Sequence, residues 1–178
     1  MAEATSEGCG PFVRTAGLSL VATATFVLAC PAHTTAGGIQ QHLAATLTVD
    51  RFQEYLDDPD RMLFLAESEG LPVGYTMVIL GEPVDPDVRS AVTLRPTAEL
   101  SKCYVVAGHH GQGIAAELMR LSVDAAAARG ASGIWLGVND QNMRANRFYE
   151  KSGFDIVGTK SFFVGGEKES DFVRERAL

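Results

Sequence analysis

The sequence predicts an α/β fold with a mixed, mostly antiparallel central sheet flanked by helices. Apolar runs of helical length alternate with runs of strand length along the chain, and glycine or proline closes many of them. The chain has 178 residues, of which 46% are hydrophobic and 21% are charged. That composition is typical of a folded protein with a sizeable core. We therefore expect one domain over residues 1–178, with 1–17 as an irregular N-terminal segment.

The first sixty residues predict helices. Residues 11–14 predict a short first strand, and Leu18–Ala29 predicts a mostly apolar helix that ends before Pro31. Two further short helices are expected over 39–47 and 49–56. Thr48 is a suitable N-cap for the second of these, and the Asp57-Asp58-Pro59 run ends it.

From residue 62 the pattern changes to strands interrupted by two helices. A glycine- and proline-containing turn over 68–72 predicts a hairpin between the first two strands, and 81–96 is expected to be a loop. The expected strands cover 62–67, 73–80, 97–106, 134–138, 154–164 and 170–176. The expected helices cover 114–129, which ends at Gly130, and 142–152, which ends at Gly153.

The charge and cysteine content narrow the functional classes. A net charge of −7 and a pI near 5.0 argue against a nucleic-acid-binding protein and are compatible with a cationic substrate. The three cysteines, Cys9, Cys30 and Cys103, have neither metal-site spacing nor the pattern of a disulfide framework. We therefore expect a cytoplasmic protein that binds no metal.

The apolar run Leu18–Cys30 allows a second interpretation. Its end, Val27-Leu28-Ala29-Cys30, weakly resembles a lipoprotein cleavage site. However, residues 1–17 contain two glutamates and one arginine where a signal peptide has a basic region, and the run is too short to span a bilayer. A buried helix without membrane association is favoured, and a structural or lipoprotein role is the alternative.

The segment His109–Met119 lies where a predicted strand meets a predicted helix. Gly111 and Gly113 let backbone N–H groups face a ligand without interference from a Cβ atom. The helix N-terminus adds a partial positive charge, so the turn suits a phosphate or pyrophosphate. A Gly-x-Gly pair alone is equally compatible with a tight turn that binds nothing. Neither a dinucleotide-binding fingerprint nor a Gly-Lys-Ser/Thr phosphate loop is present.

A second motif follows in the predicted helix over 142–152. It consists of Asn142, Ala145, Phe148, Tyr149, Gly153 and Phe154. Together with Gly113 and Ala115, this spacing resembles the GNAT superfamily of acyl-CoA-dependent N-acyltransferases. In that family the turn begins with Arg or Gln, whereas this chain has His110. The resemblance covers residues 97–160 and implies the fold of that family, with acetyl-CoA as the acyl donor.

The resemblance also implies roles for single residues. Backbone groups of Val105 and Val106 would pair with the pantetheine arm, and the N–H groups of residues 111–116 would hold the pyrophosphate. The Asn142 side chain would contact the cofactor. The implied cofactor-binding residues are Tyr104, Val105, Val106, His110, Gly111, Gln112, Gly113, Ile114, Ala115, Ala116, Asn142, Phe148 and Tyr149.

Tyr149 is the implied general acid for the leaving thiolate, because a phenol with a reference pKa of about 10 can protonate a thiolate in a dry site. The Val106 N–H could polarise the thioester carbonyl. Glu99 is the candidate general base, acting directly or through water; a solvent-facing acid at a strand start is the alternative. The His110 side chain either adds charge near phosphate at lower pH or is merely exposed. We expect His109 to be solvated and Trp135 to belong to the core.

These observations predict an N-acetyltransferase that moves an acetyl group from acetyl-CoA directly to a primary amine of a small molecule. Residues 161–173 are similar to bacterial polyamine acetyltransferases of the PaiA type, which makes a polyamine the first candidate. Peptide or protein amines and antibiotics are alternative acceptors, and a non-catalytic acyl-CoA-binding protein is the alternative class. The family resemblance is also compatible with a homodimer.

Overall fold

The computed structural model describes residues 3–4, 11–29, 46–164 and 167–178. Hydrogen-bonded neighbours follow the order β1-β2-β3-β4-β5-β7-β6. Of the strand pairs with a defined register, β4–β5 is parallel, and β1–β2, β5–β7 and β6–β7 are antiparallel. The predicted α/β fold with a mixed, mostly antiparallel sheet is therefore confirmed. Residues 1–77 with 102–121 form one compact unit, and residues 78–101 with 122–178 form another. Residues 1–17 were expected to be irregular, but Glu3–Ala4 pairs with a later strand and a helix begins at Pro11.

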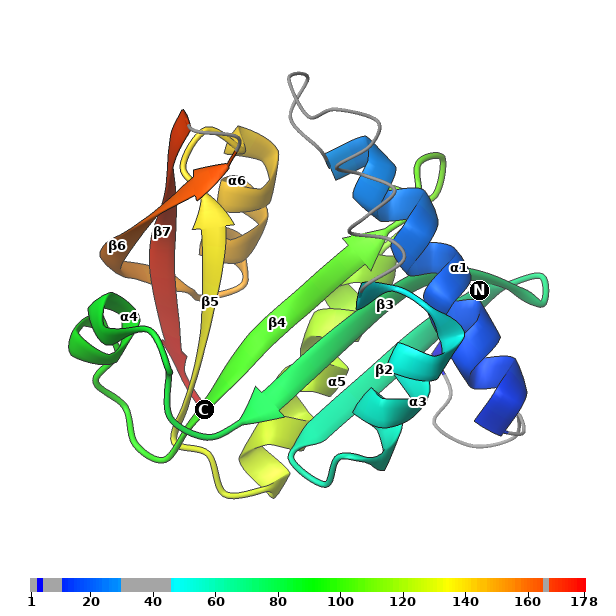
Figure 1. Cartoon of the computed structure of the whole chain (residues 1–178), viewed down its shortest axis with the longest axis horizontal. Coiled ribbons are helices and arrows are strands. Elements are labelled where there is room, and N and C mark those ends of the chain that lie inside the picture. Colours follow the sequence, from blue (N-terminus) through cyan, green and yellow to red (C-terminus); the bar gives the residue numbers. More distant parts are fainter. Residues whose placement is uncertain (1–2, 5–10, 30–45, 165–166) are drawn as a thin grey trace. The chain divides into compact units, whose positions relative to one another are not determined.

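The first unit contains the N-terminal helices and the strands against which they pack (Figure 1). Its complete elements are β1 (Glu3–Ala4), α1 (Pro11–Ala29), α3 (Val49–Asp57) and β2 (Arg61–Ser68). It also holds the first part of β3 (Leu71–Leu80), the end of β4 (Thr97–Val105) and the first half of α5 (Ile114–Ala128). The predicted strands over 62–67 and 73–80, the helix 49–56 and its Thr48 cap are confirmed here, and the Thr48 side chain accepts a hydrogen bond from Arg51 N.

Aromatic side chains fix the core of the first unit. The Phe52 and Tyr75 rings meet edge to face at 5.8 Å, and Tyr104 stacks on Tyr75 with ring centroids 5.8 Å apart. This cluster joins α1 and α3 to the strands, whereas Ile114 and Leu118 of α5 pack in a second cluster with Val73. Burial of this kind contributes about 1.5–3 kcal/mol for each large apolar side chain.

The helix α1 differs from the prediction at its start. A strand was expected over 11–14, but the helix begins at Pro11. Proline is favoured in the first helical turn because its ring fixes φ and its missing N–H would have no partner there. The inner positions Leu18, Val21 and Ala22 are buried, which confirms a packed helix. In the described part of the chain, no helix is long and apolar enough to cross a membrane. The expected helix over 39–47 falls mostly on residues 39–45, which lie outside the described residues.

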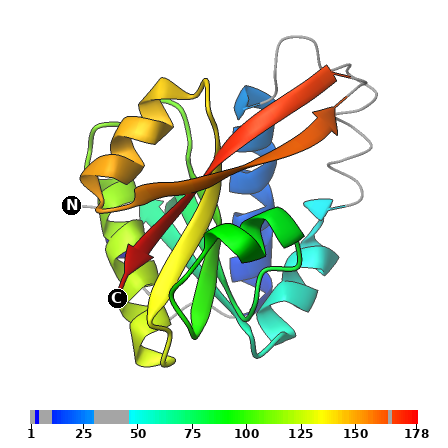
Figure 2. The same cartoon turned by 90° about the vertical axis from the view of Figure 1, so that its left-hand side faces the viewer.

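The second unit contains the strands of the C-terminal half and two short helices. Its complete elements are α4 (Pro86–Ala91), β5 (Gly133–Asn139), α6 (Met143–Lys151), β6 (Asp155–Val164) and β7 (Glu167–Ala177). β6 and β7 run side by side as a long antiparallel pair (Figure 2), and β7 pairs in turn with β5. The predicted helices and strands of this half are confirmed within one to three residues at their ends.

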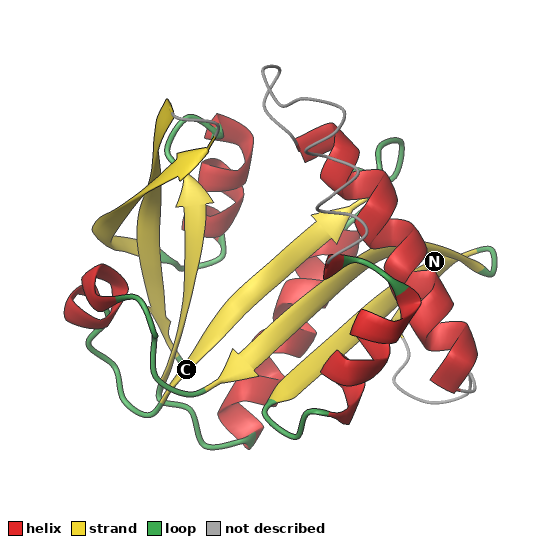
Figure 3. Ribbon diagram, viewed as in Figure 1, coloured by secondary structure: helices red, strands yellow, loops and turns green. Residues whose placement is uncertain are grey.

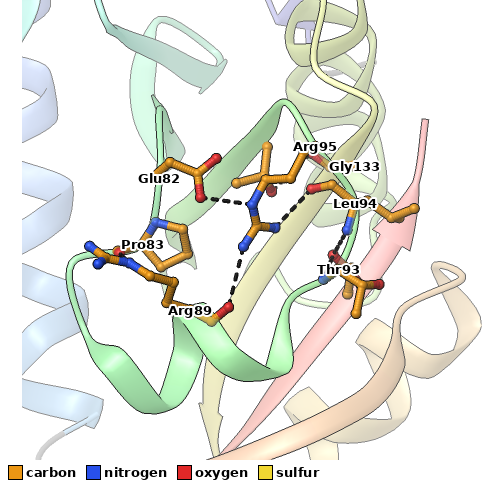
Figure 4. A network of polar contacts seen from close by, with 9 residues as sticks. Glu82, Pro83, Arg89, Thr93, Leu94, Arg95 and Gly133 are labelled. Carbon is orange, nitrogen blue, oxygen red and sulfur yellow. Dashed lines mark hydrogen bonds and ion pairs between the residues drawn. The ribbon is translucent and has the colours of Figure 1, made fainter.

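Residues 81–96 were expected to be a loop, but they contain the short helix α4 (Figure 3). Asp85 caps it, with Pro86 in its first turn, a start signal that the sequence does contain. Arg95 then holds the segment together: its guanidinium pairs with Glu82 at 2.7 Å and donates to the carbonyl oxygens of Leu94 and Arg89 (Figure 4). These contacts fix the chain that leads into β4.

Candidate active site

The turn between β4 and α5 has three glycines in left-handed conformations. Gly108, Gly111 and Gly113 have φ values of 89°, 79° and 83°. A Cβ atom at any of these positions would meet no atom within 4 Å, so conformation rather than close packing requires glycine. The first intrahelical acceptor in use is Gly113 O, which receives Glu117 N at 3.0 Å. The amides of residues 111–116 donate to no other described residue, which leaves a row of unpaired donors at the start of α5.

The polar side chains of this turn bond to its backbone. His110 Nε2 lies 2.8 Å from the carbonyl oxygen of Val105, and Gln112 Nε2 donates to Gly108 O at 3.1 Å. His110, which was expected near phosphate or simply exposed, is exposed but also caps a strand carbonyl. The glycine turn therefore presents backbone donors, and its own side chains stabilise its conformation.

His109 was expected to be solvated, but it is half-buried, and its Nδ1 atom has no partner among the described residues. It lies beside a groove of about 540 Å³ within the first unit. The groove is lined by Leu20, Ser68, Glu69, Leu71, Pro72, Val73, Val106, His109 and Gln112.

The role expected for the Val106 N–H, at the end of β4, is wrong. The Val106 N–H donates to Val73 O at 2.9 Å, so it is committed to β3 and is not available to polarise a thioester carbonyl. Because backbone groups alternate along a strand, those of Val105 face the opposite edge. The Tyr104 ring packs in the core of the first unit. Of Tyr104, Val105 and Val106, Val105 has the best placed backbone for pairing with a ligand.

Glu99 lies earlier on β4, in the second unit, opposite Trp135 of β5 in the parallel register. Its side chain is half-buried, so it is neither a purely solvent-facing acid nor a core residue. Trp135 is buried with Val88, Val92 and Val173, and the prediction that it belongs to the core is confirmed.

The Asn-to-Phe motif spans one helix from cap to cap. The Asn142 side chain accepts a hydrogen bond from Ala145 N at 3.1 Å, so it is the N-cap of α6. At the other end Gly153 has a φ of 82°, and Phe154 N donates to Tyr149 O at 3.0 Å. Together with the bond from Gly153 N to Glu150 O, this is a Schellman motif. The motif's spacing thus has a direct physical cause, while the contact of Asn142 with a cofactor stays a prediction.

The aromatic residues of this motif form a small cluster. The Tyr149 ring lies 5.4 Å from the Phe148 ring and 6.1 Å from the Phe154 ring. Phe154 is 1% exposed, whereas Phe148 and Tyr149 are both half-buried. The Tyr149 ring is tilted against Phe148 and meets Phe154 edge to face, and part of the Tyr149 side chain stays accessible.

Asn146 of α6 and Arg174 of β7 form a buried polar network that the sequence motifs do not include. Asn146 Nδ2 donates to the carbonyl oxygens of Asn139 and Asn142, and Asn146 Oδ1 accepts from Arg174 Nε at 3.2 Å. Arg174 also donates to Phe154 O at 2.9 Å.

Glu117 and Arg120 form an exposed ion pair in the first turns of α5. Glu117 accepts hydrogen bonds from Arg120 at 2.6 and 2.9 Å. These bonds hold the pKa of the Glu117 carboxyl below its usual range, so it stays ionised and paired at neutral pH. In the core, burial raises the pKa of Tyr75 well above its ordinary value, so that phenol stays protonated.

With this geometry described, the chain can be compared with known proteins. The model of the acetyltransferase (GNAT) family matches residues 31–154. That match covers more than half of the chain, so the protein belongs to the GNAT family of N-acetyltransferases. It is thus an enzyme of the acetyl-CoA-dependent N-acetyltransferase class, and the predicted class is confirmed.

Relatives and neighbours agree on this class. Uncharacterised N-acetyltransferases of Mycobacterium tuberculosis and Mycobacterium bovis are 45% identical over 161 residues, covering 90% of this chain and 96% of theirs. A streptothricin acetyltransferase of Streptomyces lavendulae is 40% identical over 62 residues, 35% of this chain and 33% of its own. Among solved structures, the PaiA N-acetyltransferase of Thermoplasma acidophilum with coenzyme A has a TM-score of 0.73 at 15% identity, covering 100% of this chain and 99% of that one. That last likeness concerns the fold.

Proposed function

We propose that this enzyme acetylates a primary amine of a small cationic molecule, with a polyamine as the first candidate acceptor. The use of acetyl-CoA as donor is supported by the backbone amides of residues 111–116 at the start of α5, which have no partner within the described part of the chain. Such a row fits a pyrophosphate, because several N–H groups and the helix dipole act on the same anion.

The residues of the first unit fit an acyl-CoA donor. The amides of 111–116 hold the pyrophosphate, and the Val105 backbone pairs with the pantetheine arm. His110 occupies the Val105 carbonyl at 2.8 Å, so this side chain leaves that acceptor when the donor binds. Acetyl-CoA supplies an activated thioester, and the role of the chain is to bind and orient it.

The residues of the second unit supply proton transfer. Tyr149 donates its phenolic proton to the leaving thiolate, and Glu99, directly or through water, takes the proton that the amine loses as the new C–N bond forms. Both side chains are half-buried, which allows contact with a ligand while limiting water. Transfer is direct, with donor and acceptor bound together, and involves no acyl-enzyme.

Two features bear on the acceptor. The net charge of −7 favours a cationic amine, because long-range attraction raises its local concentration. The 62-residue likeness to a streptothricin acetyltransferase supports an amine-bearing antibiotic as a second candidate. Peptide N-termini are a third candidate, and the fold alone does not favour them.

The test is release of free CoA by the purified protein with acetyl-CoA and a panel of amines. The panel contains spermidine, streptothricin, a peptide with a free N-terminus and a neutral primary amine. We expect the highest kcat/KM for spermidine, and mass spectrometry should find the product heavier by one acetyl group. A preference for streptothricin would select the antibiotic acceptor, and tight acetyl-CoA binding without turnover on any amine would support the non-catalytic class.

A further inference from the structure

The helix that carries Tyr149 has no fully buried apolar side chain to fix it. α6 is nine residues long, and its one buried side chain is the polar Asn146, which is 6% exposed. A helix of this length is marginal in water by itself, so tertiary contacts decide its orientation. The contacts of Asn146, together with the packing of the half-buried Phe148 and Tyr149, therefore determine how α6 lies on the second unit.

Arg174 of β7 completes these contacts. It is 6% exposed, and its guanidinium donates from Nε to Asn146 Oδ1 at 3.2 Å and from Nη1 to Phe154 O at 2.9 Å. Phe154 N in turn donates to Tyr149 O at 3.0 Å. One planar guanidinium thus joins Asn146, in the first half of α6, to Phe154, which lies just beyond the end of the helix. Tyr149 lies between these two residues in the sequence.

The charge of Arg174 is not balanced by an acid. All of its hydrogen-bond partners are neutral, and no carboxylate of the described residues forms an ion pair with it. Burying an uncompensated cation costs free energy, and an apolar side chain of similar size would fill the space without this cost. The guanidinium therefore contributes geometry, two fixed donors in one plane, rather than a large stabilisation.

We propose that Arg174 is a positioning residue for acetyl transfer, acting on Tyr149 through Asn146 and Phe154. The inference rests on the proposed function, in which Tyr149 is the general acid. A general acid must lie within hydrogen-bond reach of the atom it protonates, and a displacement of about 1 Å can cost a factor of about one hundred. Arg174 fixes the orientation of α6, so that the Tyr149 hydroxyl stays within hydrogen-bond distance of the leaving thiolate.

The test is a double-mutant cycle on the full-length enzyme, measured as CoA release with acetyl-CoA and the best amine of the panel. Arg174→Met should lower kcat by about tenfold or more, with KM for acetyl-CoA changed by less than about twofold. In Tyr149→Phe the acid is gone, so adding Arg174→Met should change kcat by less than about twofold. Effects that multiply in the double variant would overturn the positioning role.

Two controls separate positioning from stability. Arg176 lies two residues further along β7, and its Nη1 donates to Ser152 O at 2.8 Å without contacting Asn146. Arg176→Met should keep kcat within about threefold of the wild type, because one part-buried hydrogen bond at the helix end is lost. The pair Arg174→Met with Asn146→Leu leaves no buried side-chain donor without a partner and should fold at least as well, as judged by thermal unfolding. A stable pair variant with low kcat supports the proposal, and one with the wild-type kcat overturns it.

The same cycle distinguishes this inference from the proposed function. If Tyr149→Phe keeps the wild-type kcat across the pH range, the acid role assigned to Tyr149 is wrong, and the positioning role fails with it. If Tyr149→Phe is slow but Arg174→Met multiplies its effect, the acid role stands and only the positioning role is overturned. Arg174→Lys keeps the charge and one donor, so it should recover part of the kcat lost in Arg174→Met.

Discussion

The glycine turn before α5 and the helix α6 present their functional groups in opposite ways. The turn presents its backbone: its amides over 111–116 have no partner among the described residues, and His110 and Gln112 bond to carbonyl oxygens of the turn and strand. In α6 the backbone ends are closed by Asn142 and by the Schellman motif at Gly153, so the proposed functional group is a side chain, that of Tyr149.

This difference fits the two tasks that we propose. A pyrophosphate is a diffuse anion that several equivalent donors can share, so no single side chain has to be placed accurately. A proton donor acts at one atom, so the helix that carries it must be fixed by contacts from elsewhere. The Arg174–Asn146 bond, which joins residues 28 positions apart, is such a contact. The following variants test this contrast, from the largest expected effect to the smallest.

Tyr149→Phe should have the largest effect. Removing the phenolic proton while keeping the ring should lower kcat by about 10²-fold or more, with KM for acetyl-CoA little changed. Steady-state CoA release measures both constants. Tyr55→Phe is the matched control, because Tyr55 lies on α3 with its ring 4.9 Å from the Arg61 guanidinium and has no assigned catalytic role. Equal losses in the two variants would contradict a specific role for Tyr149.

Gly113→Val should mainly affect donor binding. Gly113 and Gly130 both have φ values of 83° with open space around a Cβ, so a valine should strain each backbone by about 1–2 kcal/mol. Only Gly113 lies in the turn that faces the anion. We therefore expect the Kd for acetyl-CoA, measured by calorimetry, to rise about tenfold or more in Gly113→Val and to stay unchanged in Gly130→Val. A rise in both variants would mean that strain alone explains the loss.

Much of this contrast could be predicted from the sequence because it is local. The glycine turn, the Thr48 cap, and the strands and helices from residue 49 onward depend on neighbouring residues. The two local misses, the helix start at Pro11 and the helix α4 at Asp85-Pro86, came from start signals that were not recognised.

The remaining features depend on contacts that sequence patterns do not show. The Val106 N–H seemed available until the pairing of β4 with β3 committed it to Val73. Which group a strand amide meets depends on the order of the strands in the sheet, and that order is decided by contacts between residues far apart in the sequence. Likewise Asn146 and Arg174 look like ordinary polar residues until the fold buries them against each other.

His110→Ala should have a smaller effect on the turn. The imidazole caps the Val105 carbonyl at 2.8 Å, and in the proposed donor site that acceptor serves the pantetheine arm. Removing a competing hydrogen bond of about 0.5–1.5 kcal/mol should tighten acetyl-CoA binding by about threefold. His110→Gln keeps a side-chain amide donor and should bind acetyl-CoA as the wild type does. Weaker binding in His110→Ala would mean that the imidazole contacts the donor itself.

Arg120→Ala should have the smallest effect, and its sign follows from a pKa. Arg120 holds the pKa of the Glu117 carboxyl below its usual range; without Arg120 that pKa rises only toward the ordinary range of a carboxyl, so Glu117 stays ionised between pH 6 and 8. Glu117 lies one helical turn after Gly113, with its N–H bonded to Gly113 O, so the unpaired carboxylate would repel an anion bound at the turn. The Kd for acetyl-CoA should rise about twofold at low salt, and the rise should shrink at about 0.5 M salt because of screening.

Lowering the pH to 6 should not restore binding, whereas adding Glu117→Gln should, because only that change removes the charge. A twofold loss that persists in the double variant would instead assign Arg120 a direct contact with the donor.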